Sequence, residues 1–343
     1  MTSSGDLGDL FAASSRVADA TGLGPLRHVE VTGSTNLDLA AQARAGSVSP
    51  AVLVADHQSA GRGRLGRRWD DEPRKALLVS IRLPLDRFAA GPDRVAAGPD
   101  RFAAGLDRFA AGPDRVAAGP DRVAAGPDRV AAGPDRVAAG PDRVAGVVAA
   151  VGAAARRAAD QLTTSKVLTK WPNDLVVVDG PAPGKLGGVL AEYIAEPAES
   201  VVVGVGINVG AIKRRPAATP MPATPMLATP MPATPMAATP MAATSMVECG
   251  MDNRGSLEDR DLLLSSLLAE LAPRLADPTS VLEELRSNSA TLGTRVRVEL
   301  AGERFVVGEA TGLTNEGHLL VRGDDATILT ITTGDVIHLR SGL

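Results

Sequence analysis

Arginine and glycine alternate closely in the segment Gly61–Arg68, which follows an apolar run ending at Asp56. A guanidinium group presents a planar fork of N–H donors that matches the oxygens of a phosphate or a carboxylate. The three glycines of the segment allow its backbone to wrap closely around an anion. The segment therefore predicts an anion-binding loop, although a solvated basic loop explains this string alone equally well.

The spacing of these glycines also fits the G-x-G-x-x-G pattern of dinucleotide-binding folds. That pattern requires a helix directly after its last glycine. Here Trp69–Pro73 continues as a loop instead. The dinucleotide interpretation therefore fails in its structural context.

A second polar segment is Lys170-Trp171-Pro172-Asn173-Asp174. Proline cannot donate to a sheet ladder, so the chain must turn here. The turn presents a lysine, an amide and a carboxylate together near a strand end. Taken alone, an ordinary surface turn is the better explanation.

Two further segments combine glycine with a polar residue. In Gly184–Gly188 a lysine, Lys185, leads a strand whose glycines permit close approach of a ligand. In Gly204–Val209 two glycines leave room on an apolar strand that Asn208 interrupts. A solvated lysine and a plain buried strand explain these segments when each is taken by itself.

Composition limits the classes of function that the chain can have. The 343 residues carry a net charge of −4, which offers no electrostatic basis for a nucleic-acid partner. Cys249 is the only cysteine, and the four histidines lack metal-ligand spacing, so no metal site is expected. The acidic N-terminus does not resemble a secretory signal, and the apolar run Gly146–Ala155 is too short for a membrane span. We expect a soluble, cytoplasmic protein with no membrane partner.

Two repeat tracts interrupt the chain. The unit D-R-(V/F)-A-A-G-P recurs every seven residues over 86–141, and A-T-P-M-x recurs every five over 218–247. Gly-Pro pairs break helices, and units with so few large apolar residues bury too little surface to offset the entropy of ordering. We predict flexible insertions without chemistry. A partner-binding segment is the alternative, and nothing in the sequence favours it.

The remaining sequence has the texture of a globular protein. Apolar periodicity predicts helices over 36–45, 144–162, 257–275 and 280–289, the first capped by Ser34 or Thr35. Strands are predicted over 51–56, 76–83, 175–178, 186–194 and 200–207. From Gly293 the pattern changes to short alternating strands, which predicts a small barrel of about five strands.

The polar segments occur in the order found in biotin protein ligases, and from about Val29 to Arg340 the sequence resembles that family. Five motifs carry the resemblance: Ser34-Thr35-Asn36, His57–Arg64, Lys170–Asp174, Gly184–Gly188 and Gly206–Asn208. The most specific of them are the segment Gly61–Arg68, called the arginine loop below, and the K-W-P-N-D string Lys170–Asp174. Gly293–Val298 is similar to the start of the family's C-terminal SH3-like barrel.

The resemblance implies an α/β (α+β) fold: a mixed β-sheet flanked by helices, of the class II aminoacyl-tRNA synthetase and lipoate–biotin ligase type. It divides the chain into an N-terminal extension (1–27), a biotin- and ATP-binding catalytic domain (28–290) with insertions at 86–141 and 218–247, and the C-terminal barrel (291–343). No DNA-binding domain is expected, because only about 28 residues precede the first motif.

The activity implied is ATP-dependent biotinylation. Biotin and ATP give biotinyl-5′-adenylate and pyrophosphate, and biotin then passes to a lysine of a biotin carboxyl carrier protein. Attack of a carboxylate on a phosphate is repulsive without fixed positive charge, which arginines, Lys185 and Mg²⁺ on the ATP phosphates would supply. By resemblance, Lys185 is the essential lysine, Arg64 lies on the loop over biotin and the α-phosphate, and Asp174 positions the acceptor amine or accepts its proton.

The resemblance also implies the binding residues. Biotin contacts are expected at Ser34, Thr35, Asn36, Gln58, Gly61, Arg62, Arg64, Lys185, Gly188 and Gly206. Contacts to ATP or the adenylate are expected at Arg62, Arg64, Arg67, Trp69, Lys170, Asn173, Asn208, Thr244 and Ser245.

Three departures and three rivals accompany this interpretation. The turn between Asp174 and Lys185 is longer than usual in the family, the heptad tract replaces a segment that carries tryptophans near adenine in many relatives, and the pentad tract enters the loop after Asn208.

The three rivals are alternative functions. The short, non-basic N-terminus disfavours a biotin-responsive repressor, and the arginine loop and K-W-P-N-D disfavour a lipoate ligase. Retention of Arg62, Arg64 and Lys185 disfavours an inactive relative.

Overall fold

The computed structural model describes residues 10–69, 72–86, 140–212, 241–252, 255–300 and 304–339. Nearly all of the heptad tract and residues 218–240 of the pentad tract fall outside these ranges, so their predicted flexibility stays a prediction. Among the described residues, no helix is both long and apolar enough to cross a bilayer.

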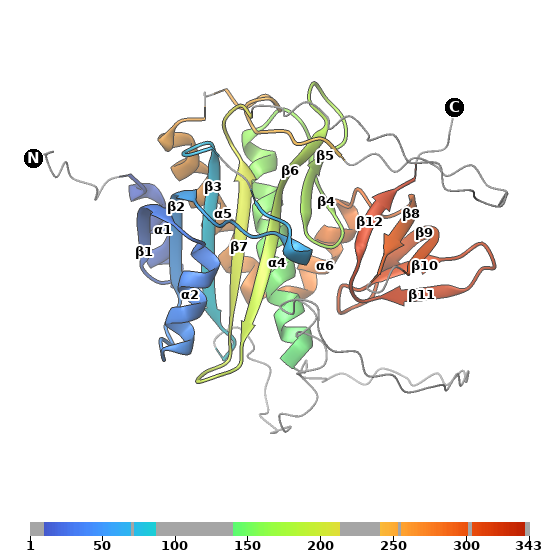
Figure 1. Cartoon of the computed structure of the whole chain (residues 1–343), viewed down its shortest axis with the longest axis horizontal. Coiled ribbons are helices and arrows are strands. Elements are labelled where there is room, and N and C mark those ends of the chain that lie inside the picture. Colours follow the sequence, from blue (N-terminus) through green and yellow to red (C-terminus); the bar gives the residue numbers. More distant parts are fainter. Residues whose placement is uncertain are drawn as a thin grey trace, which may run out of the picture.

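A mixed seven-stranded sheet lies at the centre of the larger folded part of the chain (Figure 1). Its strands lie in the order β1-β2-β3-β7-β6-β5-β4, with β1 parallel to β2 and every other neighbouring pair antiparallel. β3 and β7 are runs of apolar, mostly branched residues buried along nearly their whole length, as strands covered on both faces must be. The bounds are β1 Leu26–Thr32, β2 Ala51–Gln58, β3 Ala76–Pro84, β4 Val167–Lys170, β5 Asp174–Val177, β6 Gly184–Ile194 and β7 Ser200–Asn208.

Helices cover both faces of this sheet. α4 (Gly140–Leu162) and α5 (Leu257–Ala276) pack together and against β3, β6 and β7, and bury the main apolar core. α2 (Thr35–Arg44) covers the opposite face, on β2, β3, β6 and β7 (Figure 1). α6 (Pro278–Ser287) follows α5 and leads toward the C-terminal sheet. The mixed sheet flanked by helices is confirmed.

Two details of the N-terminal region differ from expectation. Ser34 is the N-cap residue of α2, as predicted, but its side chain makes no capping hydrogen bond and instead lines the cavity described below. Within the predicted N-terminal extension, residues 10–25 fold onto the rest of the chain. α1 (Ala12–Ala20) packs on α5, and the backbone N–H of Ser14 donates to Asp261 Oδ1 at 2.9 Å. The sequence did not predict α1, because Ala12–Ala20 is mostly alanine and serine and holds only one large apolar residue, Val17.

The C-terminal domain is an all-antiparallel sheet of five strands in the order β11-β10-β9-β8-β12. The strand number agrees with prediction. Val296, Val298, Leu319 and Val321 form its core, and Trp171 of the K-W-P-N-D motif packs against it. The bounds are β8 Arg295–Glu299, β9 Phe305–Leu313, β10 Leu319–Arg322, β11 Ile328–Ile331 and β12 Asp335–His338.

The end of the pentad tract belongs to the folded domain. The N–H of Lys185 donates to Ala242 O at 2.7 Å, and the N–H of Thr244 donates to Lys185 O at 2.9 Å. Met246 is completely buried and its N–H donates to Asn208 O at 2.9 Å. The flexible insertion predicted to reach residue 247 therefore does not extend over 241–247.

Candidate active site

A cavity of about 790 Å³ lies between the α2 face of the large sheet, the arginine loop and the C-terminal sheet. It brings together segments that are distant in the sequence. Most of the predicted site residues line it: Ser34, Thr35, Asn36, Gln58, Arg62, Arg64, Arg67, Trp69, Lys170, Asn173, Asp174, Lys185, Gly188 and Gly206.

Four predicted residues lie behind the lining rather than in it: Gly61, Asn208, Thr244 and Ser245. Gly61 closes the base of the arginine loop, where its carbonyl accepts from the Trp69 N–H at 3.0 Å and an added Cβ would meet Trp69 O at 2.6 Å. Asn208 Nδ2 donates to Thr244 O at 2.9 Å, and Thr244 and Ser245 are fully buried. These residues hold the lining in place.

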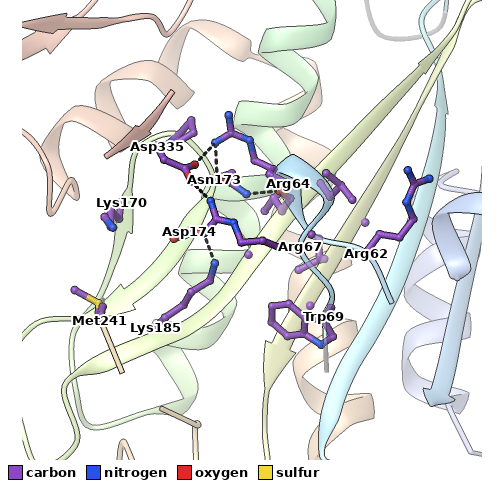
Figure 2. Close-up of a pocket in the computed structure, with 18 of the residues that line it drawn as sticks. Arg62, Arg64, Arg67, Trp69, Lys170, Asn173, Asp174, Lys185, Met241 and Asp335 are labelled. Carbon is purple, nitrogen blue, oxygen red and sulfur yellow. Dashed lines mark hydrogen bonds and ion pairs between the residues drawn. The ribbon is translucent and has the colours of Figure 1, made fainter. Parts of the chain in front are cut away.

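The arginine loop is a compact hairpin. The backbones of Arg62 and Arg68 form an isolated antiparallel β-bridge. The Gly63 N–H donates to Arg67 O at 2.7 Å around a short 3-10 turn at Arg64–Gly66. The hairpin directs Arg64 and Arg67 toward Asn173 and Asp174, while Arg62 extends from its other side (Figure 2). Arg64 is one-tenth exposed and donates to Asn173 Oδ1 at 3.2 Å.

Lys185 and Asp174 meet at one wall of the cavity. Lys185 Nζ lies 2.6 Å from Asp174 Oδ1 (Figure 2). Strands β5 and β6 bring them together, because Asp174 opposes Gly188 and the pairing shifts register between Leu175 and Val176. The K-W-P-N-D turn is thus a hairpin between β4 and β5, with its polar residues at the strand ends, as the proline predicted.

This end of the cavity gathers four cationic side chains, those of Arg64, Arg67, Lys170 and Lys185. Burial lowers the pKa of Lys170, and the nearby charges of Lys185 and Arg67 lower it further, against the opposing effect of Asp174. Burial likewise lowers the pKa of Arg64. An anion bound here would interact favourably with Lys170 and Arg64, because burial has removed part of the water that solvates their charges.

The opposite end, called the uncharged end below, carries uncharged polar groups. The Thr35 N–H donates to Gln58 Oε1 at 2.8 Å, and both residues line the cavity. The Trp69 indole covers Gly206 so closely that an added Cβ would meet the ring at 2.9 Å. The glycines of β7 therefore leave room as predicted, and the arginine-loop tryptophan occupies it at Gly206.

The C-terminal sheet supplies a wall that the sequence analysis missed. Asp335, on β12, forms ion pairs with Arg67 and, at 3.7 Å, with Arg64 (Figure 2). His338 on the same strand lines the cavity, and burial, reinforced by Lys170, lowers its pKa to about 4. No local pattern marks these residues, since their partners lie over a hundred residues away in the sequence.

Trp171 ties the two sheets together beside this wall. Its indole N–H donates to Gly317 O at 3.0 Å, and its backbone N–H donates to Thr291 Oγ1 at 3.0 Å. Because the same motif carries Asn173 and Asp174, packing of the C-terminal sheet and placement of the polar site residues are linked. This explains a bulky aromatic residue within a polar turn.

Comparisons with known proteins agree with this geometry. Residues 132–208 match the model of the biotin/lipoate A/B protein ligase family, and residues 291–339 match that of the biotin protein ligase C-terminal domain. The chain is 31% identical over 320 residues to the biotin--[acetyl-CoA-carboxylase] ligase of Mycobacterium tuberculosis, covering 91% of this chain and 88% of that relative. The chain belongs to the biotin protein ligase family.

Solved structures of the family share the fold. A biotin protein ligase from Aquifex aeolicus in complex with biotin and ATP superimposes with a TM-score of 0.55 at 21% identity, covering 92% of this chain and 99% of that one. A second crystal structure of the Aquifex aeolicus biotin protein ligase gives a TM-score of 0.53 at 19% identity, over 92% of this chain and 98% of that one. The mixed sheet with a small antiparallel C-terminal sheet is therefore the architecture of biotin protein ligases.

Proposed function

We propose that the chain carries out both half-reactions of a biotin–[acetyl-CoA-carboxylase] ligase in the cavity described above. Biotin and ATP react to biotinyl-5′-adenylate and pyrophosphate, and the biotinyl group then passes to a lysine of a carboxylase carrier domain. The observation that carries the proposal is one cavity that has uncharged polar side chains at one end and four cationic side chains at the other. This matches a neutral bicyclic urea joined through its carboxylate to a nucleotide.

The uncharged end takes the biotin ring system. Ser34, Thr35 and Gln58 offer hydrogen bonds to the ureido group, and Gly188 and Gly206 are the β-strand positions that border its slot. Asn36, Gly61 and Arg62 contribute indirectly or from the rim, since the Asn36 amide nitrogen is already engaged by Leu190 O at 3.0 Å.

The cationic end takes the reacting carboxylate and the phosphates. Arg64, Arg67, Lys170 and Lys185 neutralise charge that builds up when the carboxylate attacks the α-phosphate. Asn173 completes the nucleotide side, with Asn208, Thr244 and Ser245 supporting it from behind. Trp69, whose indole covers Gly206 at the uncharged end, would contact the adenylate from that end. Bound Mg²⁺ would add positive charge at the phosphates. The described residues hold no group of three or more His, Cys, Asp or Glu side chains for a metal, which suits an ion that ATP itself carries.

Asp174 serves both half-reactions in this scheme. Before adenylation it holds Lys185 Nζ at 2.6 Å. When the lysine turns to the phosphates, the carboxylate is free to position the acceptor amine and accept its proton. The domain division at residues 28–290 and 291–343 is proposed on the same basis, with β12 closing the cavity.

The test is pyrophosphate release by the full-length chain with ATP and either biotin or lipoate. Release that requires biotin, and that lipoate does not support, is the expected result. Equal release with lipoate would place the chain with lipoate ligases, and no release with either acid would contradict the proposed activity.

A further inference from the structure

Three polar side chains form a buried hydrogen-bonded chain beneath the uncharged end of the cavity. They are Thr35 and Asn36 at the start of α2 and Ser80 in the middle of β3, each at most 6% exposed. Thr35 and Asn36 line the cavity, whereas Ser80 lies behind them. Ser80 interrupts the otherwise apolar run Ala76–Ile81, and none of the recognised motifs includes it.

The orientation of the Asn36 amide follows from its backbone partner. Asn36 Nδ2 lies 3.0 Å from Leu190 O, and a carbonyl oxygen can only accept. The nitrogen must face Leu190, so Oδ1 faces Ser80 Oγ at 2.5 Å. Gly204 holds the amide from the other side, since an added Cβ there would meet Asn36 Oδ1 at 2.4 Å.

The direction of the next two hydrogen bonds is then determined. An amide oxygen carries no proton, so the single hydroxyl proton of Ser80 goes to Asn36. Ser80 Oγ lies 2.7 Å from Thr35 Oγ1 and must accept there, because its own proton is used. The Thr35 hydroxyl proton therefore points into the protein, and its free lone pair is the group left for a ligand.

Gln58 completes the pattern with the opposite polarity. Its Oε1 accepts from the backbone N–H of Thr35 at 2.8 Å, and an N–H can only donate. Oε1 is also the second acceptor within reach of the Thr35 hydroxyl, at 3.2 Å. The amide group of Gln58 that remains for a ligand is thus its Nε2 donor.

We propose that Ser80 is a specificity-determining positioning residue, which makes Thr35 an obligatory hydrogen-bond acceptor toward the ligand. The uncharged end then presents the Thr35 hydroxyl oxygen as an acceptor next to Gln58 Nε2 as a donor. A cyclic urea has the complementary pair, an N–H beside a C=O. The inference rests on the proposed function, in which the ureido ring of biotin occupies this end.

The test compares biotin with its two cyclic carbamate analogues, each of which has oxygen in place of one ureido N–H. Binding to the full-length chain is measured by titration calorimetry. In the wild type, the analogue whose oxygen faces Thr35 meets lone pair against lone pair, and we expect it to bind at least about tenfold more weakly than biotin. In Ser80→Ala the Thr35 hydroxyl loses its nearer acceptor and keeps only the longer contact of 3.2 Å to Gln58 Oε1, so its proton can also turn toward the ligand. The ratio of the affinity for biotin to the affinity for this analogue should therefore fall by about threefold or more.

Ser200→Ala is the matched control. Ser200 is a buried serine on the neighbouring strand β7. Its hydroxyl has no hydrogen-bond partner among the described residues, and it does not line the cavity. The ratio should stay at the wild-type value in this variant. Should Ser80→Ala fail to fold, Ser80→Cys replaces it, because a thiol of similar size is a weak donor and acceptor; its ratio should also fall.

A ratio in either Ser80 variant equal to that of the wild type would overturn the inference, as would an equal loss of affinity for biotin and both carbamates, which indicates only a packing role. A wild type that does not bind biotin at all would instead contradict the proposed function.

Discussion

Removing the charge of Lys185 separates the chemistry of the site from the stability of the fold. Its Nζ lies 2.6 Å from Asp174 Oδ1, yet the two side chains are 36% and 21% exposed. Pairs this accessible to water contribute about 0–1 kcal/mol to stability. We therefore expect Lys185→Ala to lower the free energy of unfolding by no more than about 1 kcal/mol.

The expected effect on adenylation is far larger. A unit positive charge about 4 Å from a developing negative charge, at an effective dielectric constant of about 20, stabilises it by about 4 kcal/mol. Loss of that interaction in the transition state alone corresponds to a rate reduction of about a thousandfold. The structure supports this assignment because Lys185 stands at the start of β6, on the cavity wall, rather than in the core.

The assay is biotin-dependent pyrophosphate release by Lys185→Ala, with thermal unfolding followed in parallel. Lys166→Ala is the matched control, since Lys166 is an exposed lysine that precedes β4 and does not line the cavity. The control should release pyrophosphate at the wild-type rate. Native-rate release by Lys185→Ala, or a loss of activity matched by unfolding, would refute the reasoning.

Three further predictions test other parts of the site. Arg64→Ala should weaken retention of biotin and the adenylate about tenfold or more, because Arg64 is a largely buried cation in the cavity lining. In the wild type, tryptic cleavage within Gly61–Arg68 should fall when biotin and ATP are added, and equal cleavage would contradict loop closure over ligand. His338→Gln should flatten the pH dependence of stability between about pH 6.5 and 4. In the wild type the folded pKa of His338, about 4, lies below the unfolded value, so the unfolded chain binds a proton first and the free energy of unfolding falls by about 2 kcal/mol by pH 5. Denaturant titrations of both proteins at pH 7 and pH 5 measure this loss, and an equal loss in the variant would contradict the prediction. A variant in which a short Gly/Ser linker replaces residues 87–139, between Asp86 and α4, should still transfer biotin. Its free energy of unfolding should rise by at most about 2 kcal/mol, because each halving of the length of a loop gains about 0.6 kcal/mol. Loss of adenylation in a folded deletion variant would show that the heptad tract has a role at the nucleotide.

The elements with strong local signals could be predicted from the sequence. β3 and β7 are apolar runs bounded by turn residues, and α5 carries both a regular apolar stripe and a capping box at Ser256. β4 was missed because Val167–Lys170 is only four residues long and gains its identity from pairing with β5. α1 was missed because its few apolar residues find their partners on α5.

The candidate site divides in the same way. Lys185, Asp174 and the arginine loop are recognisable because glycine, proline and charge stand together in short motifs. Asp335 and His338 are not, since they gain significance only when β12 folds against the loop. Ser80 shows only a polar interruption in an apolar strand, the same signal as Asn208, and its significance depends on the Thr35 and Asn36 side chains that meet it.

The most direct test of the central claim is transfer of biotin by the full-length chain to a purified biotin carboxyl carrier domain, followed by intact-protein mass spectrometry. We predict one biotin added per carrier domain, dependent on ATP and abolished when the acceptor lysine is replaced by arginine. An unmodified carrier domain in the presence of biotin, ATP and Mg²⁺, with the ligase shown to be folded, would contradict the account.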